Sequence, residues 1–258
     1  MIKVYNNGKE FLDENTYLLN ENRYLNTFIF LDAELLSEAN KINYAIRVEF
    51  DNKVLLGLRL EPFDILLYGD NTCLDELFNF LDSNNYYYEG FQCSTVNGDY
   101  LVRNYGYTET LAMDFMIAKE KTEKSSNLVT IPTICDLDTL YEYSLSFAKE
   151  CGITLSTDKE HLKNMISSFR VLRENGRIVS MAKMSLDASG TYRITHVYTH
   201  PDYRNQGYAR LVVNTIKNEI IALGTYATLN VDKKNPISNH LYLSLGFTKL
   251  FSLGVYKK

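Results

Sequence analysis

The segment from Val197 to Ala209 combines a strand, a glycine loop and a helix start, an arrangement that can bind phosphate. Pro201 ends a run of β-branched and aromatic residues, and helical apolar spacing begins at Ala209. A helix start presents unpaired backbone N–H groups and the positive end of the helix dipole, which together attract an anion. Gly207 lets the backbone approach a ligand because it has no Cβ. The same residues also suit an ordinary strand-to-helix turn packed through Gly207 and Ala209.

Apolar periodicity in the second half of the chain predicts the elements that would position this loop. Helical spacing and strand-like alternation follow one another. We predict helices over 137–148, 209–223 and 238–245 and strands over 178–186, 192–199, 227–231 and 247–256. Strand, loop, helix and strand in this order form an α/β unit, so we expect a mixed sheet flanked by helices.

The strand after Asn175-Gly176 is predicted from a hairpin turn and from period-2 alternation. Asn-Gly favours a tight two-residue connection between the segments before and after it. Side chains of a strand point alternately to its two faces. The pattern therefore predicts one face with Ile178, Ala182, Met184 and Leu186 and another with Val179, Met181, Lys183 and Ser185.

Three ordered motifs resemble those of the GNAT superfamily of N-acetyltransferases. Arg204-x-x-Gly207-x-Ala209 resembles its acetyl-CoA loop, Gln/Arg-x-x-Gly-x-Gly/Ala. Val197-Tyr198-Thr199-His200-Pro201 resembles the strand that precedes this loop. Asn235, followed by Leu241-Tyr242-Leu243-Ser244-Leu245-Gly246-Phe247, resembles its closing motif. The resemblance covers about 128–258 and makes a functional loop more credible than a packing turn.

The resemblance implies which residues bind acetyl-CoA. The diphosphate would lie on the loop amides, and the pantetheine would pair with the strand before the loop. The loop residues are Arg204, Asn205, Gln206, Gly207, Tyr208 and Ala209, and the strand residues are Val197, Tyr198 and Thr199. Asn235 would bond the cofactor or fix its loop, or it is only a turn residue before Pro236.

The resemblance also implies an amine that attacks the thioester directly, with no enzyme nucleophile. Tyr242 is then the candidate general acid for the departing thiolate, because a phenol stays protonated at neutral pH. Family members often place a carboxylate base on the strand that Arg193 to Thr199 forms here, but this stretch has no Asp or Glu. His196 is a candidate base, and a water chain would serve equally well. Both Tyr242 and His196 also have structural interpretations, as a core tyrosine and a strand histidine.

The polar segment from Lys119 to Asn127 divides the chain. It is either a long surface loop or, as we favour, a linker between domains over 1–124 and 128–258. The first half is similar to the second in outline: both contain a hairpin, and Tyr105-Gly106-Tyr107 echoes Leu245-Gly246-Phe247. The first half has no Arg-x-x-Gly-x-Gly/Ala loop. We therefore expect an α/β (α+β) fold of tandem GNAT-like domains, each a mixed, mostly antiparallel twisted sheet flanked by helices, with one cofactor per chain.

Composition excludes several classes of protein. The chain has 258 residues, 45% of them hydrophobic and 23% charged, which is typical of a globular protein. The net charge of -5 argues against a nucleic-acid partner. The four cysteines have no zinc or redox spacing and are too few for a disulfide framework, so we expect no metal and a reducing compartment. With no apolar signal core at the start and no run of about 20 apolar residues, we expect a cytoplasmic protein without a membrane partner.

The function predicted from the sequence is acetyl-CoA-dependent N-acetyltransfer to a primary amine of a small molecule or peptide. The alternative is an acyl-CoA-binding sensor or interaction module without turnover. The first domain could shape the acceptor pocket or make a homodimer contact.

Overall fold

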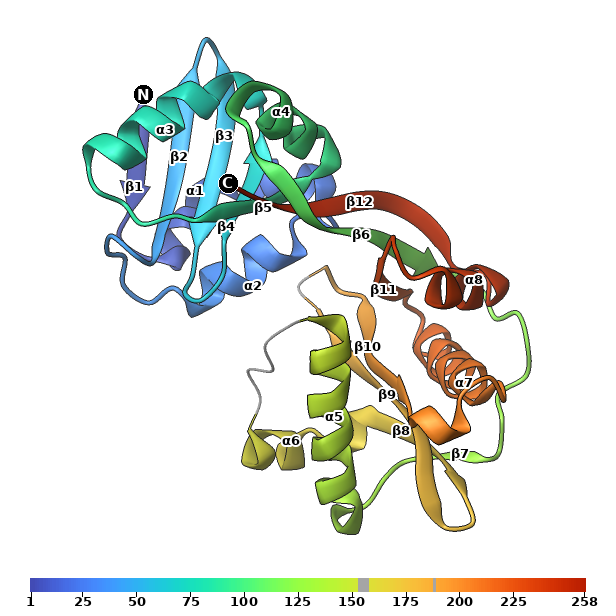
Figure 1. Cartoon of the computed structure of the whole chain (residues 1–258). Coiled ribbons are helices and arrows are strands. Elements are labelled where there is room, and N and C mark those ends of the chain that lie inside the picture. Colours follow the sequence, from blue (N-terminus) through green and yellow to red (C-terminus); the bar gives the residue numbers. More distant parts are fainter. Residues whose placement is uncertain (153–157, 188) are drawn as a thin grey trace. The chain divides into compact units, whose positions relative to one another are not determined.

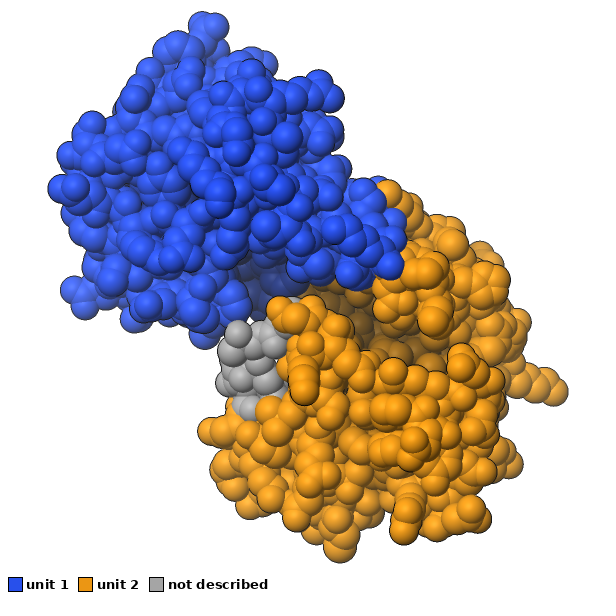
Figure 2. Space-filling model, in the orientation of Figure 1, with its two compact units in different colours: residues 1–115, 232–234, 250–258 blue, residues 116–231, 235–249 orange. Residues whose placement is uncertain are grey.

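The chain forms two compact units (Figure 2). A computed structural model describes residues 1–152, 158–187 and 189–258. The first unit contains residues 1–115, 232–234 and 250–258, and the second contains 116–231 and 235–249. Two long strands, β6 (Thr108–Ala118) and β12 (Thr248–Lys257), each contribute residues to both units. Each unit is described below by itself.

The first unit is a mixed sheet with helices against it (Figure 1). Its strands are β1 (Ile2–Tyr5), β2 (Tyr44–Phe50), β3 (Lys53–Arg59), β4 (Ile65–Gly69) and β5 (Gly90–Ser94). Neighbours from β1 to β4 are antiparallel, β4 and β5 are parallel, and β12 is antiparallel to β5. Its helices are α1 (Gly8–Leu19), α2 (Thr27–Leu35), α3 (Leu74–Ser83) and α4 (Thr95–Tyr105), with 3-10 turns at Asn20–Asn22 and Asn71–Cys73.

The second unit is the mixed, mostly antiparallel sheet predicted from the sequence. Its strands are β7 (Val129–Thr130), β8 (Phe169–Glu174), β9 (Arg177–Leu186), β10 (Tyr192–Thr199) and β11 (Ala227–Asp232). Neighbours from β7 to β10 are antiparallel, and β10 and β11 are parallel. Its helices are α5 (Leu137–Cys151), α6 (Lys159–Asn164), α7 (Tyr208–Ala222) and α8 (Pro236–Ser244), with 3-10 turns at Ile134–Asp136, Ile166–Ser168 and Pro201–Tyr203.

Helices cover both faces of the second sheet (Figure 1). Leu140 of α5 and Leu162 of α6 pack with Met181 on one face. Val212 and Val213 of α7 pack with Ala182 on the other. Residues of β9 therefore enter two separate cores, and the run from 178 to 183 is buried.

The two units repeat one order of elements. Antiparallel β2, β3 and β4 lead through α3 to parallel β5, just as β8, β9 and β10 lead through α7 to parallel β11. The fold class predicted from the sequence, with similar sheets flanked by helices, is confirmed.

The hairpin turn at Asn175-Gly176 is also confirmed. Both residues have positive φ, 48° and 79°, as a tight turn between twisted strands requires. One prediction about the following strand was wrong. Ile178 packs with Met181 rather than with Ala182, because the register with β8 shifts between Leu172 and Arg173. The extra residue reverses the face on which Ile178 and Val179 lie.

Part of the predicted linker is fixed along α7. The Asn214 and Asn218 side chains donate to backbone oxygens of Lys124 and Glu123, at 3.0 and 2.6 Å. Lys217 is fully buried, and its ammonium donates to Thr122 Oγ1 at 2.6 Å and to the Leu245 carbonyl at 2.7 Å. Residues 122–124 are therefore part of the second unit's structure rather than a free tether.

Membrane-spanning helices are not found in the part of the chain that the structure describes, since none of its helices combines the required length and apolarity.

Gly98→Ala tests whether β12 completes the first unit. Gly98 lies in α4, and a Cβ there would overlap the ring of Tyr256 from β12. Both the helix backbone and the buried ring resist displacement, so we expect a loss of about 3 kcal/mol in the free energy of unfolding. Urea denaturation of the variant and the parent protein measures this loss.

Gly106→Ala at the end of the same helix is the matched control. A Cβ built at Gly106 has no neighbouring atom within 4 Å, although its φ of 71° disfavours alanine. We expect this variant to lose only about 1 kcal/mol. Equal losses in the two variants would contradict the packing of Tyr256 against α4.

Candidate functional site

The loop between β10 and α7 leaves the start of the helix open. Gly207 is the N-cap of α7 with a φ of 80°, and no side chain caps the helix. A Cβ built at Gly207 has no neighbouring atom within 4 Å. Asn205, Gln206 and Gly207 are exposed. Helix N–H groups next to open space form an arrangement that can receive an anionic ligand.

Arg204 and Tyr208 fix this loop to its surroundings. Arg204 Nε donates to the carbonyl of Thr199 at 3.0 Å, and its Nη2 donates to Glu150 Oε1 at 2.6 Å. Tyr208 Oη donates to Glu174 Oε2 at 2.9 Å. Because Glu150 already pairs with the guanidinium, Arg204 orders the loop more than it supplies an unneutralised charge.

The strand before the loop pairs with one neighbouring strand up to its end but separates from the other. β10 pairs with β9 up to Thr199 and Ser180. With β11 its registered pairs are only Tyr192 with Ala227 and Arg193 with Thr228. Within the described residues, the β11-side edge from 194 to 199 therefore makes no registered strand pair. This stretch includes Val197, Tyr198 and Thr199, the strand residues predicted from the sequence.

A β-bulge interrupts β10 at His196. Thr195 pairs with Lys183 and Tyr198 pairs with Met181, so that His196 and Val197 together lie opposite one residue of β9. His196 has a φ of 51°, which is uncommon for a non-glycine residue. Val197 packs on the α7 side of the sheet.

The bulge directs the His196 imidazole toward α5. The ring stacks on Phe147 with centroids 5.1 Å apart and meets the edge of Phe169 at 5.9 Å. Burial, and secondly the charge of Lys183, lower the pKa of His196 to about 4. Its Nδ1 is buried and has no hydrogen-bond partner among the described residues. The imidazole is therefore neutral at neutral pH, with one nitrogen unsatisfied.

Tyr242 lies in the core of the second unit. Its side chain on α8 is 6% exposed and meets Phe247 in an edge-to-face contact at 6.0 Å. Burial, and secondly the Cys151 thiol, raise the pKa of Tyr242, so the phenol keeps its proton at neutral pH. Within the described part of the chain, no hydrogen bond joins Tyr242 to residues 204–209.

Asn235 caps the helix that carries Tyr242. Its Oδ1 accepts from the N–H of Ser238 at 3.0 Å, and its carbonyl accepts from Asn239. Pro236 follows as the first helical residue, where its missing N–H costs nothing. The Asn235 side chain thus fixes the start of α8.

Lys183 is a candidate functional residue that the sequence analysis did not single out. Its side chain on β9 is 9% exposed and lies beside Met165, whose Sδ is 3.2 Å from the ammonium. Burial lowers the pKa of Lys183. The available signal was a lysine at an alternating position of an otherwise apolar strand.

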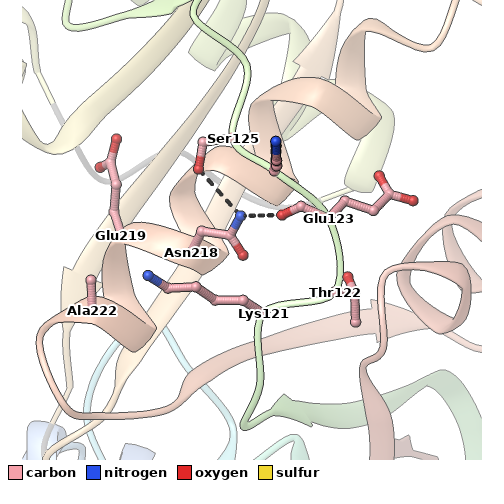
Figure 3. A pocket seen from close by; sticks show the side chains of 8 residues that line it. Lys121, Thr122, Glu123, Ser125, Asn218, Glu219 and Ala222 are labelled. Atoms are coloured by element: carbon pink, nitrogen blue, oxygen red, sulfur yellow. Dashed lines mark hydrogen bonds between the residues drawn. The ribbon is translucent and has the colours of Figure 1, made fainter.

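A shallow hollow of about 590 Å³ lies beside the second half of α7 (Figure 3). Its lining residues are Lys121, Thr122, Glu123, Lys124, Ser125, Asn218, Glu219 and Ala222. Asn218 follows Gly207 by eleven positions, or about 16 Å along a helix that rises 1.5 Å per residue. The hollow is therefore separate from the loop at the start of α7.

Comparison with known proteins identifies similar proteins for both the second half and the whole chain. Residues 137–247 match the family model described as the acetyltransferase (GNAT) family. A GNAT-family acetyltransferase structure from Colwellia psychrerythraea is 13% identical, with a TM-score of 0.65 and 100% of each chain covered. A GCN5-related N-acetyltransferase structure from Sphaerobacter thermophilus is 15% identical, with a TM-score of 0.65, covering 90% of this chain and 84% of that one. At such identities the structures show the fold alone. A search of the curated proteins finds no significant match.

His196→Asn tests the burial of the imidazole through the pH dependence of stability. The pKa of His196 is about 4 in the folded chain and 6.5 without perturbation. Between these pH values the unfolded chain binds more protons than the folded chain does. The stability that the neutral His196 imidazole contributes is therefore complete above pH 6.5 and is lost as the pH falls. From about pH 7 to about pH 5, we expect His196 to account for a loss of about 2 kcal/mol. The His196→Asn variant should not show this loss of stability, because asparagine tolerates positive φ and does not titrate.

Denaturant unfolding at the two pH values measures the difference between the proteins. His161→Asn is the matched control, since it removes the same side chain from an exposed position on α6. The control should keep the pH dependence of the parent protein. Identical pH dependence in His196→Asn would contradict the buried, neutral imidazole.

Proposed function

We propose that this chain is an acetyl-CoA-dependent N-acetyltransferase, because residues 137–247 match the family model described as the acetyltransferase (GNAT) family. The acceptor is a primary amine of a small molecule or peptide. The observation that carries the proposal is the uncapped helix start at Gly207, with open space where a side chain would project. The family supports acyl transfer in general, and the loop supports a CoA thioester as the donor.

The loop residues fit the diphosphate of CoA. The N–H groups of Tyr208 and Ala209, in the first turn of α7, can donate to phosphate oxygens, and the helix dipole favours the negative charge. Gly207 provides room for the backbone to approach. Arg204, held between Thr199 and Glu150, keeps Asn205 and Gln206 in place. Asn235, whose Oδ1 caps α8, would also bond the cofactor or fix its loop.

The open edge of β10 fits the pantetheine arm. Backbone groups of Val197 and Thr199 lie on the stretch that has no registered pair with β11. An extended ligand can pair with such an edge as an additional strand does. A backbone N–H on this edge can also donate to the thioester carbonyl and stabilise the negative charge that develops on its oxygen.

The proposed reaction needs only a bound thioester, a bound amine and proton transfer. The thioester supplies the acetyl group: the amine nitrogen bonds to the acyl carbon as the carbon–sulfur bond breaks. The amine loses a proton and the departing thiolate gains one. Tyr242 is the proposed donor of that second proton, and its raised pKa keeps it protonated. A water chain is the proposed acceptor of the first proton, because a pKa of about 4 makes the neutral His196 imidazole a weak base.

We expect one cofactor site per chain. In the first unit, the turn that leads to α3 is capped by Asp70, whose carboxylate accepts from the N–H of Thr72 at 3.0 Å. A carboxylate at this turn disfavours a phosphate close to the start of α3. At the corresponding 3-10 turn before α7 the cap is an imidazole rather than a carboxylate, since His200 Nδ1 accepts from the N–H of Asp202 at 3.4 Å.

Gly207→Asp tests the loop. The new carboxylate would project into the space proposed for the diphosphate, so steric and electrostatic terms both oppose binding. We expect the dissociation constant of acetyl-CoA to rise at least about a hundredfold, as loss of two charge-assisted hydrogen bonds would cause. Calorimetric titration measures this change, and the parent protein should bind close to one acetyl-CoA per chain.

Gly176→Asp is the matched control for the backbone strain. Gly176 has a φ of 79°, close to the 80° of Gly207, and a Cβ added there likewise has no neighbouring atom within 4 Å. It lies in the β8–β9 turn of the same unit. This variant should bind acetyl-CoA as the parent does, and unchanged binding by folded Gly207→Asp would exclude the loop as the cofactor site.

Tyr242→Phe tests the chemistry. The substitution removes one proton donor and almost no volume. General acid catalysis contributes roughly 100- to 10,000-fold, so turnover should fall at least about tenfold even where water substitutes. The dissociation constant of acetyl-CoA should stay unchanged, because the ring still packs against Phe247. Thiol-release rates in a broad amine screen, together with calorimetry, measure both quantities.

The same variant examines a second candidate function. The burial of Tyr242 in the core favours a structural role, and a chain without a proton donor could serve as an acyl-CoA-binding module. In that case Tyr242→Phe changes the melting temperature while thiol release stays at the uncatalysed level in both proteins. Turnover by the parent protein and equal turnover by Tyr242→Phe, with chemistry rate-limiting, would remove only the catalytic role of the phenol.

A further inference from the structure

Lys183 carries a buried ammonium that no carboxylate of the chain neutralises. Among the described residues, no acidic side chain lies within 4.0 Å of its Nζ, and residues 153–157 and 188 contain no Asp or Glu. Its hydrogen-bond partner is the Met165 sulfur at 3.2 Å, and the Phe169 ring lies 6.0 Å away. A thioether is a weak acceptor, and 6.0 Å is the outer limit of a cation–π contact.

A charge in this position is costly without an anion. Burying an ammonium costs several kcal/mol unless a partner compensates for the lost water. Lys217 shows how this chain satisfies another buried lysine, since its ammonium donates to two oxygens at 2.6 and 2.7 Å. Lys183 has no such oxygen among the residues that the structure describes. Its lowered pKa agrees with a charged form that is poorly compensated.

The surroundings of Lys183 belong to the candidate active site. Lys183 lies directly opposite Thr195 of β10 on one side and Phe169 of β8 on the other, so the three side chains share a face. The bulge brings His196 to this face, where its ring meets Phe147 and Phe169. His196, Phe147 and Met165 are all partly exposed. The face is therefore reachable from solvent.

We propose that the acceptor amine also carries a carboxylate and that Lys183 binds this carboxylate, with the unsatisfied Nδ1 of His196 beside it. This inference rests on the proposed function, because it names the substrate class for the same site. An amino acid or a peptide with a free C-terminus has this chemistry. The cationic Lys183 ammonium and the neutral His196 Nδ1 both gain a hydrogen-bond partner when such an acceptor binds.

The strand spacing limits how far apart the amine and the carboxylate lie. A ligand paired on the open edge of β10 would lie about two strand spacings, or about 10 Å, from β9, the strand that carries Lys183. The lysine side chain points toward Phe169 and Met165, away from that edge. An acceptor with several bonds between its two groups therefore fits better than an α-amino acid.

The first experiment measures binding without turnover. The probes are N-acetylated ω-amino acids, from acetylglycine to 6-acetamidohexanoate, each paired with its primary amide. Calorimetry with the full chain saturated with CoA should show that at least one carboxylate binds about tenfold or more tightly than its amide, with the longer probes preferred. A series in which no carboxylate is preferred would overturn the proposal.

Two lysine variants assign the preference to a residue. Lys183→Met should remove it and should not lower the melting temperature, since an apolar side chain replaces an uncompensated charge. Lys183→Arg should retain part of it. Lys163→Met is the matched control, because this lysine is exposed on α6 and pairs with Glu160. The proposal is wrong if Lys183→Met keeps the preference, or if the control loses it.

Failure of the proposed function is distinguished by a separate measurement. If CoA does not bind, the same probe pairs are titrated into the unliganded chain, so that the carboxylate preference and its dependence on Lys183 are still measured. If CoA binds, thiol release with ω-amino acids and their amides as acceptors follows. Lys183→Met should then raise KM for the carboxylate acceptors and leave kcat nearly unchanged. A fall in kcat with unchanged KM would contradict carboxylate binding.

Discussion

One extra residue in β10 determines which side chains of the second unit share a face. Side chains of a regular strand point alternately to its two faces. One extra residue between Thr195 and Tyr198 interrupts this alternation. His196 takes a left-handed conformation there and joins Lys183 under α5, while Val197 stays with α7. The helical packing on both faces holds the bulge in place, and its energetic cost is offset by that packing. The proposals for His196 and Lys183 both depend on this local geometry.

The two buried lysines differ in the acceptors that their ammonium groups contact. We assign a structural role to Lys217 and a ligand-binding role to Lys183. Lys217 joins Thr122 to the end of α8 through two oxygen acceptors, so its burial adds rigidity. Lys183 has a sulfur and an aromatic ring, neither of which replaces water well. Polar groups left uncompensated inside a fold are a cost that selection tolerates at binding sites, where a ligand completes them.

Local signals in the sequence predicted the elements of the second unit well. Asn175-Gly176 determines its own turn, and the helix after Gly207 follows from apolar spacing that needs no distant partner. Alternation failed where register depends on a neighbouring strand: Ile178 changes face because β8 and β9 shift against each other. For the same reason the sequence did not single out Lys183, whose isolation depends on which side chains the sheet brings near it. Asn235, predicted to bond the cofactor, to fix its loop or to be only a turn residue before Pro236, caps α8 through its Oδ1.

The discontinuous first unit has a consequence for how the protein folds during synthesis. β5 of that unit pairs with residues 253–257 of β12, which are translated after the whole of the second unit. At about 5–20 residues per second, residues 116–249 take on the order of ten seconds to synthesise. During this time the edge of β5 awaits its partner strand, and an unpaired edge is a site of aggregation. The second unit, although it is encoded later, can thus complete its sheet at nearly the same time as the first unit completes its own. A chaperone that shields strand edges would act on the N-terminal half of the nascent chain.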